Sequence, residues 1–304
     1  LIAVLSVFVQ VLVSSKYIGW AAMLVYFVAS VMLGNLGFEH GLYNYGGGPQ
    51  VPLSDMNGLG RFWIGQAWFQ LYWAAFATML LVLSHALWRR GTTVALRPRL
   101  AQVGRHLRGA PGITMAVAGV VWVATGGWIF YNTNVLNRYV TQPEHDRKMA
   151  DFEKTLLPFE NVVQPRVADV TLDVQLFPRA ARAVTHGTFA LVNRSDKPID
   201  VLHLQWAEDL RLDAIAFPGA TVQTDYPRFH YRIYKLAAPM QPGERRTLGF
   251  TTTLEQRGFR NGRPLTAIVP NGTFVNNLDI TPSLGFARNG VLDERAKRRK
   301  YGLP

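Results

Sequence analysis

The side chains that could carry catalysis or bind a metal are few in this sequence and lie far apart. The chain has seven histidines, 20 acids and no cysteine, which excludes thiolate zinc sites and a disulfide framework. Two dipeptides place an acid beside a histidine, Glu39-His40 and Glu144-His145. A zinc helix of the H-E-x-x-H kind needs two histidines one turn apart on one face. Neither dipeptide fits, so the sequence predicts no catalytic, metal or cofactor-binding residue in this chain.

Segment 36–61 gathers the next candidates. Four of its side chains could line the outer mouth of a transport path: His40, Tyr43, Tyr45 and Asp55. The preferred interpretation is a connection at the membrane surface, turned by glycines and with its rings at the lipid interface. The three consecutive glycines at 46–48 do not predict a phosphate site, because a Walker loop needs G-x-x-x-x-G-K and Pro49 follows them instead.

Polar side chains within apolar stretches are also candidates, since an ionisable group inside a membrane is functional by default. His85 lies close to Trp88 and an arginine-rich loop, so an interfacial histidine is the favoured interpretation. Gln66 and Gln70 are one helical turn apart. They could line a polar path, but a hydrogen bond to a neighbouring helix is preferred.

The elements around these residues begin with membrane spans. A helix needs about 20 mostly apolar residues to cross a bilayer. Three stretches meet this requirement, 17–34, 62–88 and 112–131. Residues 1–13 are apolar but too few, and since the chain begins with Leu we interpret them as the end of a further span. A signal peptide is the alternative, although a basic lead and a clear cleavage site are missing.

Arginines predict the orientation of these spans. The loop between the second and third spans contains no acid and six arginines: Arg89, Arg90, Arg97, Arg99, Arg105 and Arg108. Such a short loop stays in the cytoplasm. Segment 36–61 then lies outside, and everything after Tyr131 is delivered to the outer side, which predicts a multi-pass protein of the cell's inner (plasma) membrane with an extracytoplasmic C-terminal part. The net charge of +12 therefore reflects topology, and no nucleic-acid partner is expected.

Beyond residue 131 the sequence has the character of a water-soluble protein, with all but two of the 20 acids. Residues 132–160 predict a juxtamembrane linker with a short amphipathic helix from Pro143 to Pro158, whose charges form a solvated face. Residues 161–304 alternate apolar and polar side chains between turn signals, which predicts an antiparallel sandwich or saddle-shaped sheet. Three histidines fall on separate predicted strands, and we expect each to be exposed or hydrogen-bonded rather than part of a metal site: His186, His203 and His230.

Several separated motifs resemble one known kind of protein. The stretches "QPRVADVTLDVQLFPRAARAVTHGTFALVNRSDKPIDVLHLQW" and "MQPGERRTLGFTTTL" look like the N-terminal β domain of M1-family (gluzincin) aminopeptidases. The motifs "GFEHGLYNY", "SDMNGLGRFW", "YWAAFA", "YNTNVLNRYVT", "VPNGTFVNNLDITPSLGF" and "ERAKRRKYGLP" are similar to bacterial proteins that fuse an ABC-2-type transporter permease to an M1 aminopeptidase. The resemblance extends from about Tyr17 to Pro304.

This resemblance implies a division of labour. In the family, the zinc helix lies beyond the β domain, so it would follow Pro304, and this chain would be a non-catalytic internal fragment. Zinc and the peptide substrate would then belong to the missing domain, the lipid bilayer would hold the helices, and an ABC ATPase would be a separate chain. The family's glutamine-containing pattern is absent near Asn271, Asn276 and Asn277, so no role is transferred to these amides.

Three other interpretations stay open. A complete protein could have lost its peptidase. A membrane-tethered β-sandwich could bind a partner outside the cell without chemistry, or a permease subunit could use its β domain to recruit cargo. The basic stretch "ERAKRRKYG" could contact acidic lipid or nucleic acid, but a solvated helix leading into the next domain is preferred.

Overall fold

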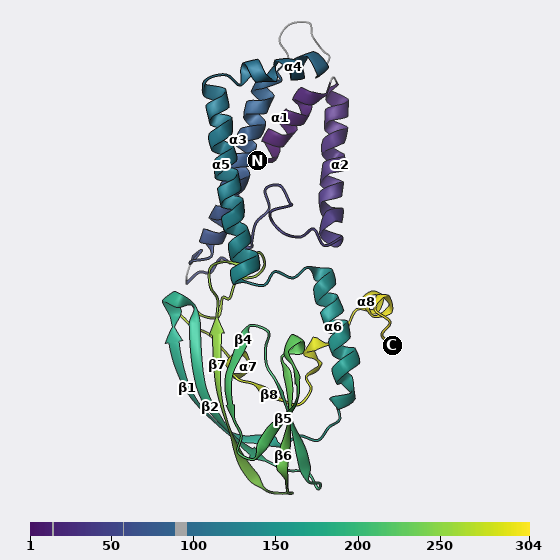
Figure 1. Ribbon diagram of the computed structural model, residues 1–304, viewed down its shortest axis with the longest axis vertical. Coiled ribbons are helices and arrows are strands. Elements are labelled where there is room, and N and C mark those ends of the chain that lie inside the picture. Colours follow the sequence, from purple (N-terminus) through teal and green to yellow (C-terminus); the bar gives the residue numbers. More distant parts are fainter. Residues whose placement is uncertain (14, 57, 89–95) are drawn as a thin grey trace. The chain divides into compact units, whose positions relative to one another are not determined.

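The structure, a computed structural model, describes residues 1–13, 15–56, 58–88 and 96–304 (Figure 1). The chain forms two compact units. The helical unit comprises residues 1–143 and 258–264, and the β unit comprises residues 144–257 and 265–304. The expected order, a helical region followed by an antiparallel β domain, is confirmed.

Three helices of the helical unit are long and apolar enough to cross a membrane: α2 (Lys16–Asn35), α3 (Trp63–Ala86) and α5 (Ala110–Phe130) with the π-helix η1 (Tyr131–Leu136). They match the predicted spans, except that the third continues past Tyr131. The continuation is stabilised by side chains that bond the preceding turn, since Asn132 Nδ2 donates to Trp128 O at 2.9 Å and Thr133 Oγ1 donates to Ile129 O at 2.8 Å. Helix α1 (Ile2–Leu12) has 11 residues and is shorter than a span, as predicted.

Aromatic side chains hold α3 against α5. The ring of Tyr72 stacks on that of Trp122 with centroids 5.4 Å apart, and Phe69 and Ile129 are fully buried in the same cluster. Gly126 makes this approach possible, because a Cβ there would lie 3.0 Å from the Tyr72 ring. A small residue at this position therefore permits close packing of the two helices.

The predicted cytoplasmic loop contains a helix that the sequence analysis missed. Helix α4 (Leu96–His106) follows α3, whereas Arg89 and Arg90 lie outside the described residues. Arg99 is not a free surface charge, since only 6% of it is exposed. Its guanidinium donates to the main-chain carbonyls of Val11 and Leu87, at the ends of α1 and α3.

The β unit is a sandwich of two four-stranded antiparallel sheets. The first has the order β1 (Arg166–Phe177), β2 (Arg182–Val192), β7 (Arg245–Glu255), β4 (Leu210–Ala216). The second has the order β5 (Ala220–Tyr226), β6 (Tyr231–Met240), β3 (Ile199–Gln205), β8 (Ser283–Leu284). Fully buried side chains from both sheets form one core, with Leu191 and Leu248 from the first and Leu204 and Met240 from the second.

Strand β1 buries less than its alternation suggests. Val170, Leu172, Val174 and Leu176 alternate with polar residues, yet only Leu172 and Val174 are partly buried. The reason is position, because β1 lies at the edge of its sheet and pairs with β2 alone. Strands β4, β5 and β8 were not predicted.

Helix α6 (Gln142–Leu156) begins beside Pro143 as expected and continues into the 3-10 turn η2 (Leu157–Phe159). From Glu144 onward it belongs to the β unit rather than to a separate linker. Its apolar face packs through Phe152 and Leu156 on Tyr231 and Ile233 of β6. This packing replaces the predicted spacer with a structural part of the sandwich.

The charges of α6 also differ from the predicted solvated face. Asp146 and Glu153 are buried and pair with Lys297 and Arg298 of the short helix α8 (Arg295–Lys300). Two cations of the basic stretch near the C-terminus are therefore engaged within the β unit, while the remainder of α8 is exposed or partly exposed.

Candidate functional site

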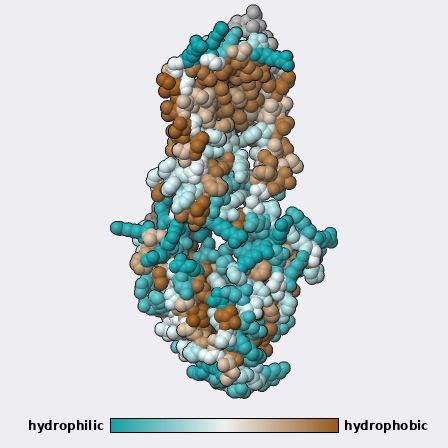
Figure 2. Space-filling model, in the orientation of Figure 1, coloured by the Kyte–Doolittle hydropathy of each residue, from teal (hydrophilic) through white to brown (hydrophobic). Residues whose placement is uncertain are grey.

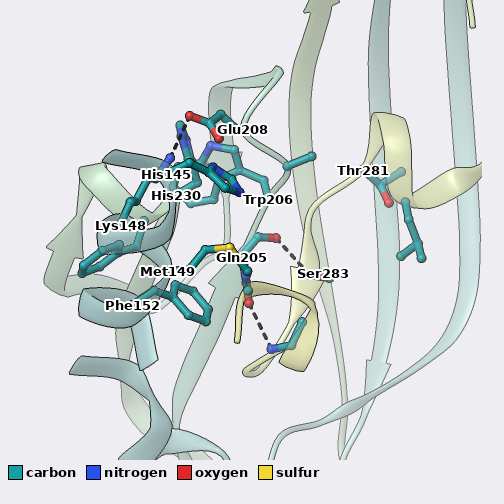
Figure 3. A pocket seen from close by; sticks show the side chains of 15 residues that line it. His145, Lys148, Met149, Phe152, Gln205, Trp206, Glu208, His230, Thr281 and Ser283 are labelled. Atoms are coloured by element: carbon teal, nitrogen blue, oxygen red, sulfur yellow. Dashed lines mark hydrogen bonds and ion pairs between the residues drawn. The ribbon is translucent and has the colours of Figure 1, made fainter. Parts of the chain in front are cut away.

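The β unit has a cleft of about 340 Å³ beside α6 (Figure 3). Three parts of the chain line it: the first turns of α6, the main chain and side chains that follow β3, and the turn before β6. A fourth part of the lining comes from residues 278–290, which contribute Leu278, Thr281, Ser283, Ala287 and Gly290. The polar and aromatic side chains at the cleft include His145, Lys148, Trp206, Glu208 and His230.

One face of α6 supplies a side of the cleft. His145, Lys148, Met149 and Phe152 recur at spacings of three and four, so they share that face. Phe152 forms the floor, stacked on Phe286 with ring centroids 5.3 Å apart. Gly290 permits this packing, since a Cβ there would lie 2.8 Å from the Phe152 ring.

The opposite side is built around a backbone of unusual geometry. His230 has φ +52°, a left-handed conformation that few residues other than glycine adopt. Its main-chain carbonyl accepts a hydrogen bond from the main-chain N–H of Trp206 at 3.0 Å. The imidazole and indole rings meet edge to face with centroids 6.0 Å apart. The Arg232 guanidinium lies 5.6 Å from the Trp206 ring. These contacts fix the indole at the cleft.

The charge in the cleft is concentrated in one ion pair. Lys148 Nζ donates to Glu208 Oε1 at 2.8 Å. Partial burial acts to raise the pKa of the Glu208 carboxyl, but the Lys148 hydrogen bond and the positive charges of Lys148, His230 and His145 outweigh it, and the pKa is lowered. Glu208 is therefore ionised at neutral pH, and it is poorly suited to donate a proton.

The hydroxyls at the cleft do not form a nucleophile. Thr281 Oγ1 donates to Asn277 O at 2.8 Å, and Ser283 Oγ donates to Gln205 O at 3.1 Å. A nucleophilic hydroxyl needs a base as its acceptor, whereas both of these bond to main-chain carbonyls. Among the described residues, no group of three His, Asp or Glu side chains could hold a metal ion. The arrangement suits binding: an apolar floor with a polar, charged rim.

The three histidines of the predicted strands are not brought together. His203 is buried and shares a 2.7 Å hydrogen bond with the Tyr231 hydroxyl, and burial lowers its pKa. His186 is exposed on the first sheet, 3.1 Å from Thr251 Oγ1. Of these three, His230 lines the cleft. His203 is hydrogen-bonded and His186 is exposed, as expected for those two.

The asparagines near residue 276 have a local structural role. Asn276 Oδ1 accepts the Asp279 N–H, and Asp279 Oδ2 accepts the Asn276 N–H. This reciprocal pair is a capping box for the short helix α7 (Asn277–Ile280). Asn271 and Asn277 lie outside the cleft lining.

In the helical unit, His40 is buried rather than resting at a lipid surface, with 3% of it exposed. The Leu42 N–H donates to His40 Nδ1 at 3.1 Å, so the ring proton resides on Nε2, which donates to Thr133 Oγ1 at 3.0 Å. Burial lowers the pKa of His40 to about 4. Neutral His40 thus joins the connection after α2 to the end of α5.

The other members of the proposed polar cluster separate. Tyr43 meets His40 edge-on but is largely exposed, and Asp55 is exposed. Tyr45 donates to the carbonyl of Leu1. The alternative of a single polar group at a transport mouth therefore lacks a basis in these contacts.

The polar side chains of α3 that were candidates, Gln66, Gln70 and His85, differ in their surroundings. Gln66 lies against Gly48 of the connection, and Gln70 is exposed. Among the described residues the buried Gln66 Oε1 accepts no hydrogen bond, so this oxygen does not make the expected bond to a neighbouring helix. His85 is exposed one residue before the end of α3.

Segment 258–264 is a structural participant that the sequence analysis missed. Although it follows β7, it belongs to the helical unit. Asn261 Oδ1 accepts the Gly41 N–H at 2.8 Å, and Asn137 Nδ2 donates to Phe259 O at 3.3 Å. Gly258 has φ +57°, and a Cβ there would lie 2.2 Å from Asn132 Oδ1. A positive-φ glycine in "RGFRNG" is the only local signal, and it does not reveal a partner more than 100 residues away.

Comparison with known proteins assigns no family. No family model matches the chain, and no curated protein matches it. One similar solved structure is a crystal structure of the chitin-binding domain of a chitinase from Pyrococcus furiosus, with 18% identity, coverage of 31% of this chain and 84% of that chain, and a TM-score of 0.18. The solution structure of the chitin-binding domain of that organism's chitinase has 19% identity, the same coverage of 31% and 84%, and a TM-score of 0.17. Such low TM-scores carry no argument about the fold or function of this chain.

Proposed function

We propose that this chain is the membrane-anchoring and bracing part of a bacterial protein that joins an ABC-2-like permease region to an M1-type zinc aminopeptidase. The helical unit holds the protein in the inner membrane. The β unit, on the periplasmic side, supports a peptidase domain without performing catalysis itself. The observation that carries this proposal is the presence, in one chain, of helices long and apolar enough to cross a membrane and of a β-sandwich with its own hydrophobic core.

Exposed apolar side chains support membrane anchoring. Trp20 of α2 and Val120 of α5 are 67% and 69% exposed, and neither has a protein partner that removes it from solvent. Burying one large apolar side chain is worth about 1.5–3 kcal/mol, so a helical surface of this kind is costly in water and stable in lipid. Figure 2 shows the apolar surface of the helices, bordered at one end by the hydrophilic residues of α4.

The arginines of α4 support the orientation. They follow α3, whereas the connection with the acids Glu39 and Asp55 precedes it. Basic residues stay in the cytoplasm. If α5 returns across the membrane from α4, as this proposal holds, the β unit that follows it lies in the periplasm.

The bracing role rests on the resemblance of the β-strand motifs to the M1 N-terminal domain. It is compatible with the cleft, where Lys148 and Glu208 pair with each other and the hydroxyls of Thr281 and Ser283 bond to main-chain carbonyls. Neither hydroxyl has a base as its acceptor. The test is an aminopeptidase assay on the full-length gene product, with and without a zinc chelator. We expect activity that the chelator removes and added zinc restores, and an H-E-x-x-H motif encoded after Pro304. A stop codon there, or chelator-resistant activity, would contradict the peptidase proposal.

The cleft favours a second candidate, a membrane-tethered binding module. Its floor of Phe152 and Met149 suits an apolar side chain of an extracytoplasmic peptide, and Lys148 and Glu208 offer polar contacts at the rim. This candidate predicts that Phe152→Ala, in a full-length protein whose gene stops at Pro304, weakens peptide capture while Phe274→Ala, at an exposed position outside the cleft, does not.

A further inference from the structure

Helix α4 is held rigidly at the end of the helical bundle. Arg99 Nη1 donates to Val11 O at 2.8 Å and to Leu87 O at 3.0 Å, and His106 Nδ1 lies 2.9 Å from Ala86 O. These carbonyls are at helix ends, where no intrahelical donor remains for them. Figure 1 shows α4 lying across this end of the helical unit. One face of α4 is thus fixed toward the bundle, and the remaining faces are presented outward.

The outward arginines have no carboxylate of the helical unit near them in the chain. Arg97, Arg105 and Arg108 are exposed. The only acids of the helical unit are Glu39 and Asp55, which lie in the connection at the other end of α3. The helical unit itself therefore supplies no carboxylate beside these guanidiniums, which leaves them available to an anionic ligand.

The arginines alternate with small side chains. Arg97, Ala101, Gly104 and Arg108 recur at spacings of four, three and four, which places them along one line. Open space surrounds Gly104, where an added Cβ would meet nothing within 4 Å. An anionic group can therefore approach the backbone between the two arginines.

An apolar stripe runs beside this line. Its members are Leu96, Leu100, Val103 and Leu107. Successive helical residues are about 100° apart around the axis. The apolar stripe therefore lies on one side of Arg97, and Arg105 lies on the opposite side of Arg97. Leu96 and Leu100 are 36% and 52% exposed and Val103 and Leu107 are partly buried, so the helical unit covers only part of the stripe. This is the pattern of a helix that lies in a membrane surface, with its apolar side toward the acyl chains.

We infer that α4, with the turn that continues it to Arg108, is an in-plane interfacial helix that binds the phosphate headgroups of anionic phospholipids through Arg97, Arg105 and Arg108. Guanidinium groups match phosphate oxygens with paired hydrogen bonds, and the neighbouring stripe is suited to acyl chains. A lipid supplies both groups at the place where the apolar helices end. This inference rests on the proposed insertion of the helices into a membrane.

The test uses the full chain in detergent and native mass spectrometry to count bound phosphatidylglycerol and phosphatidylcholine with identical acyl chains. We expect a preference for phosphatidylglycerol that weakens about fivefold for each arginine replaced by glutamine, and on the order of 100-fold for the triple variant. The matched control is Arg179→Gln, Arg295→Gln, Arg299→Gln, which removes the same charge from exposed positions of the β unit. An unchanged thermal transition in the triple variant shows that Arg99 still holds α4.

Further arms separate the alternatives. Leu100→Gln is expected to weaken both lipids equally, because it removes apolar contact but no charge. Glycerol phosphate in excess is expected to compete only partly, since it lacks acyl chains; full competition would identify a free-phosphate site and overturn the lipid assignment. Equal binding of both lipids, or an unchanged preference in the triple variant, would overturn it as well and leave a protein partner as the occupant. Carbonate extraction from membranes tests insertion separately, so its failure is distinct from loss of headgroup selectivity.

Discussion

Removing Arg298 is expected to destabilise the β unit strongly, because its partner is a buried carboxylate. Glu153 of α6 is 2% exposed and accepts two hydrogen bonds from Arg298, from Nη1 at 3.0 Å and from Nη2 at 2.8 Å. Arg298 also donates to the carbonyls of Leu292 and Pro304. Two hydrogen bonds thus join α6 to the C-terminal segment, and two more fix the Arg298 guanidinium within that segment.

Arg298→Met keeps much of the side-chain length but leaves the Glu153 charge buried and unpaired. Breaking a buried ion pair in this way costs about 3–5 kcal/mol, far more than the pair contributes relative to an apolar replacement. The double variant Glu153→Leu, Arg298→Met removes both charges, so it is expected to recover most of that loss. The single variant Glu153→Leu leaves the more accessible guanidinium unpaired and is expected to be less harmful than Arg298→Met.

The assay is urea unfolding of the full chain in detergent, followed by the circular dichroism of the strands. The matched control is Lys235→Met, which breaks an ion pair with Asp200 whose two side chains are 50% and 53% exposed. That pair is expected to contribute at most about 1 kcal/mol. A cost for Arg298→Met no greater than that of Lys235→Met, or a double variant as unstable as the sum of its single variants, would refute the reasoning.

Three further changes test the helical unit. Folding lowers the pKa of His40 from 6.5 to about 4, so the unfolded chain binds more protons than the folded chain between these pH values. The free energy of unfolding should therefore fall by on the order of 3 kcal/mol as the pH decreases from about 6.5 to about 4. His40→Gln should flatten this pH dependence, whereas the control His186→Gln should not. Arg99→Gln leaves the carbonyls at the ends of α1 and α3 without their charged donor and should cost about 2–4 kcal/mol, whereas Arg97→Gln at an exposed position should change thermal stability little. Gly258→Ala places a methyl 2.2 Å from Asn132 Oδ1 at φ +57° and should cost more than 1 kcal/mol in urea unfolding, whereas Gly262→Ala, with open space around it, should be neutral.

The amphipathic and alternating patterns predicted the elements with simple periodicity. The spans, α6 and the strands β1, β2, β3, β6 and β7 follow from such runs. Strands β4 and β5 escaped because each has a register shift at its middle, between Leu212 and Ala214 and between Val222 and Thr224. The shifts in β1 and β3 lie at the start of the strand and leave the rest of the alternation intact. A bulge interrupts the period of two on which a strand prediction depends.

Helix α4 escaped for a different reason. Its arginines were interpreted only as a sign of orientation, and "LRPRLAQVGRH" is too polar on average to suggest a helix at a membrane. The stripe of Leu96, Leu100 and Val103 carries the helical period. The burial of Arg99 could not be predicted from its charge, because it depends on main-chain carbonyls at the ends of α1 and α3 that lie 88 and 12 residues away.

The cleft could be predicted only in part. His145 and His230 were noticed as isolated residues, but nothing in their neighbourhood indicates that they share a site with Trp206 and Glu208. The cleft assembles when α6 packs on β6 through Phe152 and Tyr231. Such long-range packing leaves no fixed spacing in the sequence, and neither does the docking of segment 258–264 onto the helical unit.

The central claim, that the helical unit spans a membrane with α4 and the β unit on opposite sides, can be measured directly. Because the chain has no cysteine, single-cysteine variants report one position each. Thr247→Cys on β7 and Ala101→Cys on α4 are both at exposed positions. In spheroplasts, an impermeant maleimide should label Thr247→Cys immediately and Ala101→Cys only after lysis. Labelling of Ala101→Cys before lysis, or protection of Thr247→Cys until lysis, would contradict the account.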